Sequence, residues 1–548
     1  TTRGTHVHFD ADNIPARRPA MIAAGLWPDR TINESLDVVV ATHPDRSALT
    51  AVRLDGDKVS MTYRELAEAA DRTALGLHHL GIRQGDVVAV QLPNWWEFTV
   101  TYLACARIGA VMNPLMHIFR ERELTFMLGH SEASVVIIPS TFRGHDYRAM
   151  HDALRREVPT LQHVIAVDDD GPDGFAARFT APAWEEQAGA AEALTATRPT
   201  PDDITQLIYT SGTTGEPKGA MHSSNTLYSN IVPYAQRLDL GSDDVVLMAS
   251  PMAHQTGFMY GLMMPVILSC HAVLLDVWDP ARAVELITDR EVSFTMASTP
   301  FLNDLAVHAD ANGVVVPSLR TFLCAGAPIP GPLVERAQRA LDANIVSAWG
   351  MSENGAVTTT LLDDDPRRSI DTDGCPLPGA EVKVVDIDGT ELPVGHTGRL
   401  LVRSCSNFGG YLKRPELNAT DEDGWFDTGD VARLDEHGYI RITGRSKDVI
   451  IRGGENIPVV EIESLLYAHR AVAQVAVVAI PDDRLGERAC AVVVTKPGES
   501  FDFDEMIDHL SQARVAKNYL PEKLVVVDAM PTTPSGKIQK FKLRDEIV

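Results

Sequence analysis

The stretch Tyr209-Thr-Ser-Gly-Thr-Thr-Gly-Glu-Pro-Lys-Gly-Ala-Met-His222 is the most informative part of the sequence. It holds three glycines, four Ser/Thr hydroxyls and one lysine, and it follows an apolar run at residues 204–208 that is typical of a strand. Glycines let backbone N–H groups converge on an anion, hydroxyls add donors, and Lys218 adds positive charge. Because a helical pattern begins near Ser224, we predict a phosphate-binding loop between a strand and a helix.

The position of the lysine distinguishes this loop from the P-loop of many nucleotide hydrolases. In that motif, G-x-x-x-x-G-K-[ST], the lysine precedes Ser or Thr, whereas Lys218 lies between Pro217 and Gly219. A flexible Ser/Thr/Gly linker has a similar composition. Linkers seldom end in Pro-Lys-Gly between a buried strand and a helix, so we interpret the stretch as a phosphate site of another kind.

Strand-like and helix-like stretches alternate along most of the chain. Apolar runs at 86–92 and 133–139 predict short strands, and residues 95–108 and 281–290 have helical spacing. Such alternation indicates βαβ units with largely parallel sheets, so the predicted fold class is α/β. Residues 181–201 are rich in Ala, Thr, Glu and Pro and are predicted to be a surface connection.

The pattern changes towards the C-terminus, and 548 residues are too many for one ordinary core. After Gly379, short alternating strands separated by Gly and Pro turns predict a β-rich subdomain. A last α+β unit begins near the Gly-Arg-Ser-Lys-Asp segment at 444–448. We predict a large N-terminal body at residues 1–446 and a small C-terminal lid at 447–548.

Composition and charge exclude several classes of function. The hydrophobic fraction of 45% and the charged fraction of 23% are those of a globular protein. A formal charge of −26 repels nucleic-acid phosphates, so no nucleic-acid partner is expected. The longest apolar run, residues 258–270, is too short to span a membrane, and the N-terminal residues show no secretory signal. Six cysteines without a C-x-x-C pair indicate reduced thiols, so we expect a cytoplasmic protein.

Six further motifs follow the glycine-rich stretch: Ala325-Gly-Ala-Pro328, Trp349-Gly-Met-Ser-Glu353, Trp425-Phe-Asp-Thr-Gly-Asp430, Gly444-Arg-Ser-Lys-Asp448, Arg452-Gly-Gly-Glu-Asn-Ile457 and Pro534-Ser-Gly-Lys537. In this order they resemble the motifs of the adenylate-forming (ANL) superfamily, which includes acyl-CoA synthetases, peptide-synthetase adenylation domains and luciferases. One such match is weak, but seven in order are specific. The local sequence is most similar to that of ligases for cyclohexanecarboxylate and medium-chain acids.

The resemblance implies that ATP and an organic acid form an acyl-adenylate, and that the acyl group then passes to coenzyme A. It assigns catalytic roles to Lys537, Glu353 and Lys218, and it makes Glu353 the ligand of Mg²⁺, a cation that prefers oxygen ligands. The nucleotide-binding residues implied by the motifs are Thr210, Ser211, Gly212, Thr213, Thr214, Gly215, Gly326, Ala327, Pro328, Trp349, Gly350, Met351, Ser352, Asp430 and Arg445. For the side chain of Trp349, a wall against adenine and simple core packing stay equally open.

The two half-reactions explain why a separate lid is expected. Negative charge builds on the α-phosphoryl oxygens during adenylation, and a preorganised ammonium such as that of Lys537 stabilises it. Thiol attack instead needs room for a pantetheine arm. By resemblance, the lid turns about Lys447, and Gly453 and Gly454 then leave space for a coenzyme A tunnel.

The acyl pocket is predicted less sharply. His254 aligns with a position at the mouth of the pocket in the superfamily, and Met259 and Tyr260 lie in an apolar, Met-rich segment suited to a hydrophobic acid. Ordinary core packing explains these three residues about as well. Fatty, alicyclic and aryl acids all remain open.

The acceptor of the acyl group is the second open point. Many CoA ligases carry a lysine two residues before the proline that follows the last helix, whereas this chain has Tyr519 there. An amide synthetase, or an enzyme that loads a carrier protein, would keep every nucleotide motif. A binding or sensor protein without activity would have no need to retain Lys537, Glu353 and Asp430 together. A homodimer is left open.

Overall fold

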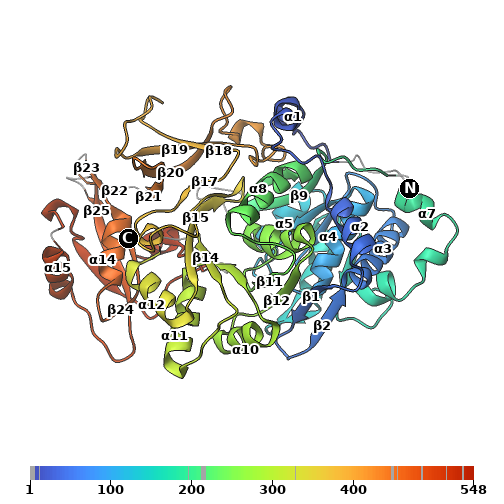
Figure 1. Cartoon of the computed structure of the whole chain (residues 1–548), viewed down its shortest axis with the longest axis horizontal. Coiled ribbons are helices and arrows are strands. Elements are labelled where there is room, and N and C mark those ends of the chain that lie inside the picture. The colour runs from blue at the N-terminus through green and yellow to red at the C-terminus, as the bar shows by residue number, and fades with distance from the viewer. Residues whose placement is uncertain are drawn as a thin grey trace. The chain divides into compact units, whose positions relative to one another are not determined.

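The computed structural model describes residues 7–11, 13–195, 197–210, 217–326, 329–445, 450–452, 455–482, 486–513, 515–533 and 536–547. The chain forms two compact units (Figure 1). Unit 1 comprises Thr1–Met296, Met351–Ala356 and Ser404–Asn418, and unit 2 comprises Ala297–Gly350, Val357–Arg403 and Ala419–Val548. Two short segments from later in the chain therefore belong to unit 1, and one of them contains Glu353.

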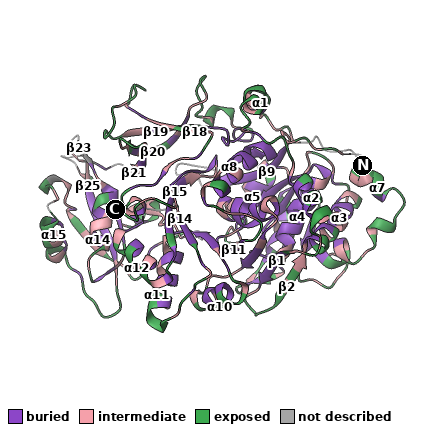
Figure 2. Cartoon of the chain, in the orientation of Figure 1, coloured by how far each residue is buried: buried purple, intermediate pink, exposed green. Residues whose placement is uncertain are grey.

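Unit 1 contains a six-stranded sheet with the strand order β10-β9-β4-β3-β5-β8. All neighbours in it are parallel except β10 and β9. The strands are β3 (Val87–Val90), β4 (Val111–Pro114), β5 (Val135–Ile138), β8 (His163–Ala166), β9 (Ile204–Thr210) and β10 (Lys218–Ser223). The residues of β3 and β5 are all buried, as expected for parallel strands covered on both faces. Figure 2 shows by colour that buried residues also make up most of β9.

A second group of strands in unit 1 runs in the order β2-β1-β12-β11-β13. Its strands are β1 (Ser47–Val52), β2 (Lys58–Thr62), β11 (Val245–Met248), β12 (His271–Leu275) and β13 (Phe294–Ala297). The two strands β1 and β2 are antiparallel, and the remaining pairs are parallel. A minor two-stranded ribbon joins β6 (Thr141–Phe142) and β7 (His145–Asp146).

Helices connect these strands. They are α1 (Asn13–Ala23), α2 (Ile32–Thr42), α3 (Tyr63–His79), α4 (Trp96–Ile108), α5 (Glu121–His130), α6 (Tyr147–Glu157), η1 (Ala176–Thr180), η2 (Trp184–Glu186), α7 (Ala190–Thr195), α8 (Ser224–Arg237), η3 (Gly257–Met263), α9 (Met264–Leu268) and α10 (Pro280–Arg290). Local sequence sets their starts: Thr62 caps α3 in a capping box with Glu65, and Ser223 caps α8.

Unit 2 begins with helices packed on short strands. Its elements up to residue 376 are α11 (Thr299–Asn312), β14 (Thr321–Ala325), α12 (Gly331–Leu341), β15 (Asn344–Met351), β16 (Gly355–Thr359), α13 (Arg368–Asp371) and β17 (Cys375–Pro376). The strands β14 and β15 are parallel, and β16 and β17 are antiparallel. The motif around Trp349 therefore lies at the carboxyl end of a buried strand.

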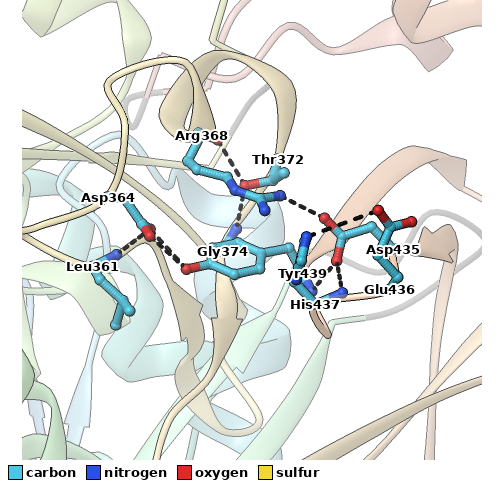
Figure 3. Close-up of polar contacts among 9 residues, drawn as sticks. All are labelled: Leu361, Asp364, Arg368, Thr372, Gly374, Asp435, Glu436, His437 and Tyr439. Atoms are coloured by element: carbon cyan, nitrogen blue, oxygen red, sulfur yellow. Dashed lines mark hydrogen bonds and ion pairs between the residues drawn. The ribbon is translucent and has the colours of Figure 1, made fainter.

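The predicted β-rich subdomain is a four-stranded sheet of β18 (Ala380–Val385), β19 (Gly398–Ser404), β20 (Phe426–Leu434) and β21 (Ile440–Arg445), with η4 (Pro415–Leu417) before β20 in the chain. A polar network ties the turn between β20 and β21 to the segment around α13 (Figure 3). The hydroxyl of Tyr439 donates to Asp364 at 2.7 Å, and the guanidinium of Arg368 lies 4.5 Å from the Tyr439 ring and 2.6 Å from Asp435. The network links the turn at residues 435–439 to the segment around α13.

The C-terminal part of unit 2 has a core of its own. Its elements are β22 (Ile450–Arg452), β23 (Glu455–Ile457), α14 (Val459–Tyr467), β24 (Val472–Asp482), β25 (Gly486–Thr495), α15 (Phe503–Gln512), η5 (Lys517–Tyr519), β26 (Lys523–Val526) and α16 (Lys540–Ile547). Along β24, Val475 and Val477 face one cluster that includes Ile462 and Met506, and Ala476 and Val478 face another. This period of two gives the sheet two buried faces, as a separately folding domain requires.

The predicted α/β class and the β-rich subdomain are confirmed. One local prediction is wrong: the glycine-rich stretch does not lead from a strand straight to a helix, because residues 218–223 form β10, which pairs antiparallel with β9. Residues 181–201 are not only a connection, since they include η2 and α7. All six cysteines lie in the described part of the chain and none of them forms a disulfide bond, as expected. Within the described residues no helix is long and apolar enough to cross a membrane.

Candidate active site

The β9–β10 hairpin places the two ends of the predicted phosphate loop side by side. Thr210, at the end of β9, is the register partner of Lys218, at the start of β10. Any chain that joins them must turn tightly within a few residues, which suits a loop of Gly, Ser and Thr. Ser211, Gly212, Thr213, Thr214 and Gly215 lie outside the described residues.

Lys218 and Glu353 meet the same tyrosine, Tyr411. The Lys218 ammonium lies 3.1 Å from the Tyr411 hydroxyl and 4.2 Å from the centre of its ring. That hydroxyl donates a hydrogen bond of 2.6 Å to Oε1 of Glu353. Burial, followed by the charge of Glu353 and the hydrogen bond to it, raises the pKa of Tyr411 well above its ordinary value. Tyr411 is therefore a neutral donor at physiological pH.

Backbone contacts hold Glu353 from its other side. The Glu353 carbonyl accepts a hydrogen bond of 2.8 Å from the N–H of Phe408. The preceding carbonyl, that of Ser352, lies 2.8 Å from Nε2 of His222. Burial lowers the pKa of His222 to about 4, so the ring is neutral, and because a carbonyl can only accept, its proton is on Nε2.

Glu353 suits Mg²⁺ in its chemistry. Its residue is 5% exposed, Oε1 is bound by Tyr411, and Oε2 accepts no hydrogen bond from the residues that the structure describes. Across those residues there is no group of three or more His, Cys, Asp or Glu side chains that could hold a metal alone. One carboxylate is nevertheless the usual protein contribution where a nucleotide supplies the other oxygens.

The predicted acyl residues Met259 and Tyr260 lie beside the same strand segment. The Tyr260 hydroxyl donates to Oδ1 of Asn230 at 2.6 Å and accepts from the N–H of Ala356 at 2.9 Å. A side chain on Gly355 would meet Cε of Met259 at 3.0 Å. Both side chains are fully buried, and the Tyr260 hydroxyl already has two hydrogen-bond partners. Their place in an acyl pocket stays a prediction.

The contacts of His254 differ from those of Met259 and Tyr260. Its ring is half-buried, its Nδ1 accepts from the N–H of Thr256 at 3.4 Å, and its carbonyl accepts from Phe258. It therefore shapes the start of η3. Packing of the ring against an acyl group stays a prediction.

Unit 2 carries the residues predicted to hold the ribose and adenine. Asp430 and Arg445 are register partners on β20 and β21, and Nε of Arg445 lies 2.9 Å from Oδ1 of Asp430. The indole N–H of Trp349 donates to Oδ2 of Asp430, also at 2.9 Å. Each carboxylate oxygen has two lone pairs, so Asp430 can still accept both ribose hydroxyls. The Trp349 side chain thus positions Asp430, a role that neither of the two sequence-based alternatives included.

Lys537 lies against Gly326 in the same unit. A Cβ atom on Gly326 would be 3.1 Å from Cε of Lys537, and one on Gly536 would be 3.0 Å from Oγ of Ser298 and Cγ of Pro300. The turn that carries Lys537 therefore packs on the start of α11 and the end of β14. Lys537 and Gly326 are more than 200 residues apart in the sequence and lie close together in unit 2.

Several predicted residues remain untested. Gly350 and Met351 end β15, which agrees with a position at a strand end. Ala327, Pro328, Lys447, Gly453 and Gly454 lie outside the described residues. The domain boundary at 446/447 therefore also stays a prediction.

Sequence reasoning missed three residues: Tyr411, His222 and Asn230. His222 closes the quoted glycine-rich stretch, so its position could have been noted. Tyr411 follows Gly409-Gly410 and is placed by strand-like pairing, since the N–H of Leu412 donates to Gly219 and that of Met221 to Gly410. No local sequence pattern predicts a pairing between segments that are almost 200 residues apart.

Comparison with known proteins agrees with this geometry. The chain matches the model of the AMP-binding enzyme family over residues 36–412 and that of the AMP-binding enzyme C-terminal domain over residues 461–537. It is 37% identical to the medium-chain fatty-acid–CoA ligase of Escherichia coli, covering 97% of this chain and 93% of the relative. It is 34% identical to a salicylyl-CoA synthase / salicylate adenylyltransferase of a Streptomyces species, with 96% and 95% covered.

Among solved structures, ATP-bound MatB from Rhodopseudomonas palustris superposes with a TM-score of 0.79 at 29% identity, covering 93% of this chain and 98% of that one. The chain belongs to the AMP-binding enzyme family, with the mixed α/β fold, larger N-terminal domain and smaller C-terminal domain of adenylate-forming enzymes. It is an AMP-forming acid–thiol ligase, which activates a carboxylic acid with ATP and passes the acyl group to coenzyme A.

Trp349→Phe tests the support of Asp430. Phenylalanine keeps a flat ring but removes the N–H donor, and hydrogen bonds to charged groups are worth enough to change affinity by about tenfold or more. We expect the KM for ATP in pyrophosphate exchange to rise about tenfold. Trp425→Phe is the control, because that ring packs under Lys383 and Arg403. An unchanged KM in Trp349→Phe would refute this role.

Gly326→Ala tests the contact with Lys537. Gly326 has φ of 92°, a conformation that disfavours side chains, and the new methyl would crowd Cε of Lys537. Adenylation should slow about tenfold or more in the wild-type background. In a Lys537→Ala background the added loss should be smaller, because the crowded partner is gone. Equal losses in the two backgrounds, measured by pyrophosphate exchange, would mean that backbone strain alone is responsible.

Proposed function

We propose that the enzyme activates a hydrophobic carboxylic acid of medium size, using Mg²⁺ with ATP, and that its C-terminal domain turns about Lys447 between the half-reactions. The observation that carries this proposal is the contact of Lys537 with Gly326. Lys537 belongs to the last motif of the chain, after the proposed hinge at Lys447. Gly326 belongs to a predicted nucleotide-binding motif before that hinge. The site residues named from the motifs take their roles from the same proposal.

In the first step a carboxylate oxygen of the acid attacks the α-phosphorus of ATP, and pyrophosphate leaves. The acid is already ionised at pH 7, so no general base is required. Lys537 donates to the oxygens on which negative charge builds, and Asp430 with Arg445 orients the ribose. In the second step the thiol of coenzyme A attacks the acyl carbon, its proton is lost, and AMP leaves.

Glu353 is the residue that would hold Mg²⁺, and Thr210 and Lys218 flank the loop that would contact the phosphates. The bound cation would neutralise part of the charge on the phosphate oxygens. The chain's own contribution is to keep the Glu353 carboxylate buried and oriented by Tyr411.

The choice of acid rests on the wall around Tyr260. Its phenol is bound by Asn230 and Ala356, and Tyr234 stacks on it at 4.2 Å, so this side of the proposed pocket is rigid. Of the described residues in this cluster, Asn230, Tyr234 and Tyr260 carry no charge that could recognise an amino acid or a second carboxylate. A medium-chain, alicyclic or aryl acid agrees with this wall, and the names of the two relatives above include a fatty and an aromatic acid.

Lys537→Ala should separate the half-reactions. We expect adenylation to fall about 10²–10³-fold, because one preorganised charged donor is lost from the transition state. Thioester formation from preformed acyl-adenylate should change much less. Pyrophosphate exchange measures the first step, and stopped-flow transfer to coenzyme A measures the second. Equal losses in both would contradict the moving domain.

A screen of acids and acceptors tests the substrate assignment. Fatty acids of increasing length, cyclohexanecarboxylate, benzoates and dicarboxylates are incubated with ATP, Mg²⁺ and coenzyme A, and acyl-CoA is detected by mass. The highest kcat/KM is expected for an uncharged hydrophobic tail of medium size. AMP release that requires an amine or a carrier protein in place of coenzyme A would favour the alternative acceptors. A cytoplasmic location and a homodimer stay predictions.

A further inference from the structure

The hydroxyl of Tyr411 lies between two opposite charges. It is 3.1 Å from the Lys218 ammonium, which can only donate, and 2.6 Å from Oε1 of Glu353, which can only accept. A phenol has one O–H to give and lone pairs to receive, so it satisfies both partners at once. Among the residues that the structure describes, this hydroxyl, and not a direct ion pair, connects Lys218 to Glu353.

The ring of Tyr411 is fixed from several directions. The backbone of residues 409–412 pairs with β10, through Gly409 to Met221 at 2.7 Å and Leu412 to Gly219 at 2.8 Å. The Lys218 ammonium lies over the ring face, and Phe408 packs edge-on against it at 4.7 Å. Tyr411 is 3% exposed. Strand pairing fixes the backbone of Tyr411, and burial and packing restrict its ring, so the hydroxyl is held between the two charges.

We propose that Tyr411 is a positioning residue that keeps Lys218 and Glu353 apart as two separate charges, so that the ammonium stays available to nucleotide phosphates and the carboxylate to Mg²⁺. The proposal rests on the functions proposed above for Lys218 and Glu353.

The physical reason is the strength of a buried ion pair. An ammonium and a carboxylate in direct contact away from water attract each other strongly, and each would then lose capacity for other partners. A neutral phenol between them donates one hydrogen bond to the carboxylate and accepts one from the ammonium, and it transfers no charge. A phenol is neutral at physiological pH, so Tyr411 keeps its proton and remains a donor to Glu353.

Tyr439 provides a matched control elsewhere in the chain. Its hydroxyl also donates to a carboxylate, that of Asp364, and its ring also lies under a cation, that of Arg368 (Figure 3). Arg368 and Asp364 have no role proposed in binding ATP. Tyr439→Phe thus removes the same kind of hydroxyl from the same kind of setting.

The test is a double-mutant cycle on ATP binding, with Tyr411→Phe, Glu353→Gln and the pair. Isothermal calorimetry gives Kd for ATP alone in EDTA and for ATP with excess Mg²⁺. In EDTA, Tyr411→Phe should raise Kd about tenfold, because Lys218 collapses onto Glu353 and withdraws from the phosphates. In the Glu353→Gln background the same change should alter Kd less than about twofold, since no charge remains to collapse onto. With Mg²⁺, Tyr411→Phe should also need about tenfold more cation for half-maximal ATP binding.

Several outcomes would overturn the proposal. They are an unchanged Kd and Mg²⁺ requirement in Tyr411→Phe, an equal loss in both backgrounds of the cycle, and the same change in Tyr439→Phe. A thermal melt of Tyr411→Phe lower than that of Tyr439→Phe would mean that the hydroxyl holds the fold, and would also overturn it. If instead the wild-type protein neither binds ATP nor exchanges pyrophosphate, the proposed function itself fails. The measurements on wild-type protein therefore distinguish that failure from a failure of the role proposed for Tyr411 alone.

Discussion

Two buried carboxylates, Glu353 and Asp430, constrain the structure around the candidate site. Taking a carboxylate out of water is costly unless hydrogen bonds replace the lost hydration. In both cases an aromatic side chain supplies one: the Tyr411 hydroxyl at 2.6 Å for Glu353 and the Trp349 indole at 2.9 Å for Asp430. Each aromatic residue is itself held by a strand or strand-like pairing, so the two charges are oriented by the sheets.

The aromatic donors have a second consequence. A neutral donor orients a carboxylate without cancelling its charge, so Glu353 keeps the charge that a cation needs, and Asp430 keeps lone pairs for hydroxyl groups. Arg445 does add a charge beside Asp430, but it is about half exposed, where screening weakens such a pair.

Much of the fold could be predicted from hydrophobic periodicity. The runs at 86–92 and 133–139 became β3 and β5, and the helical spacing at 95–108 became α4, because buried parallel strands and the helices that cover them have strong patterns. The strand β10 was missed because Lys-Gly-Ala-Met-His-Ser has no alternation. It pairs with β9 and with the backbone of residues 409–412, which lie far along the chain. The assignment of Met351–Ala356 and Ser404–Asn418 to unit 1 was also invisible to local patterns.

The sequence by itself determined the family and the kind of nucleotide chemistry. It also predicted most of the residues proposed to contact ATP, because short motifs can be recognised from their residue types alone. Only the tertiary structure decided that Lys537 lies against Gly326, that Trp349 supports Asp430, and that Tyr411 stands between Lys218 and Glu353. The reason is physical. A motif specifies which chemical groups are present, whereas distances of about 3 Å between groups some 60 to 200 residues apart depend on how strands pair and which faces are buried.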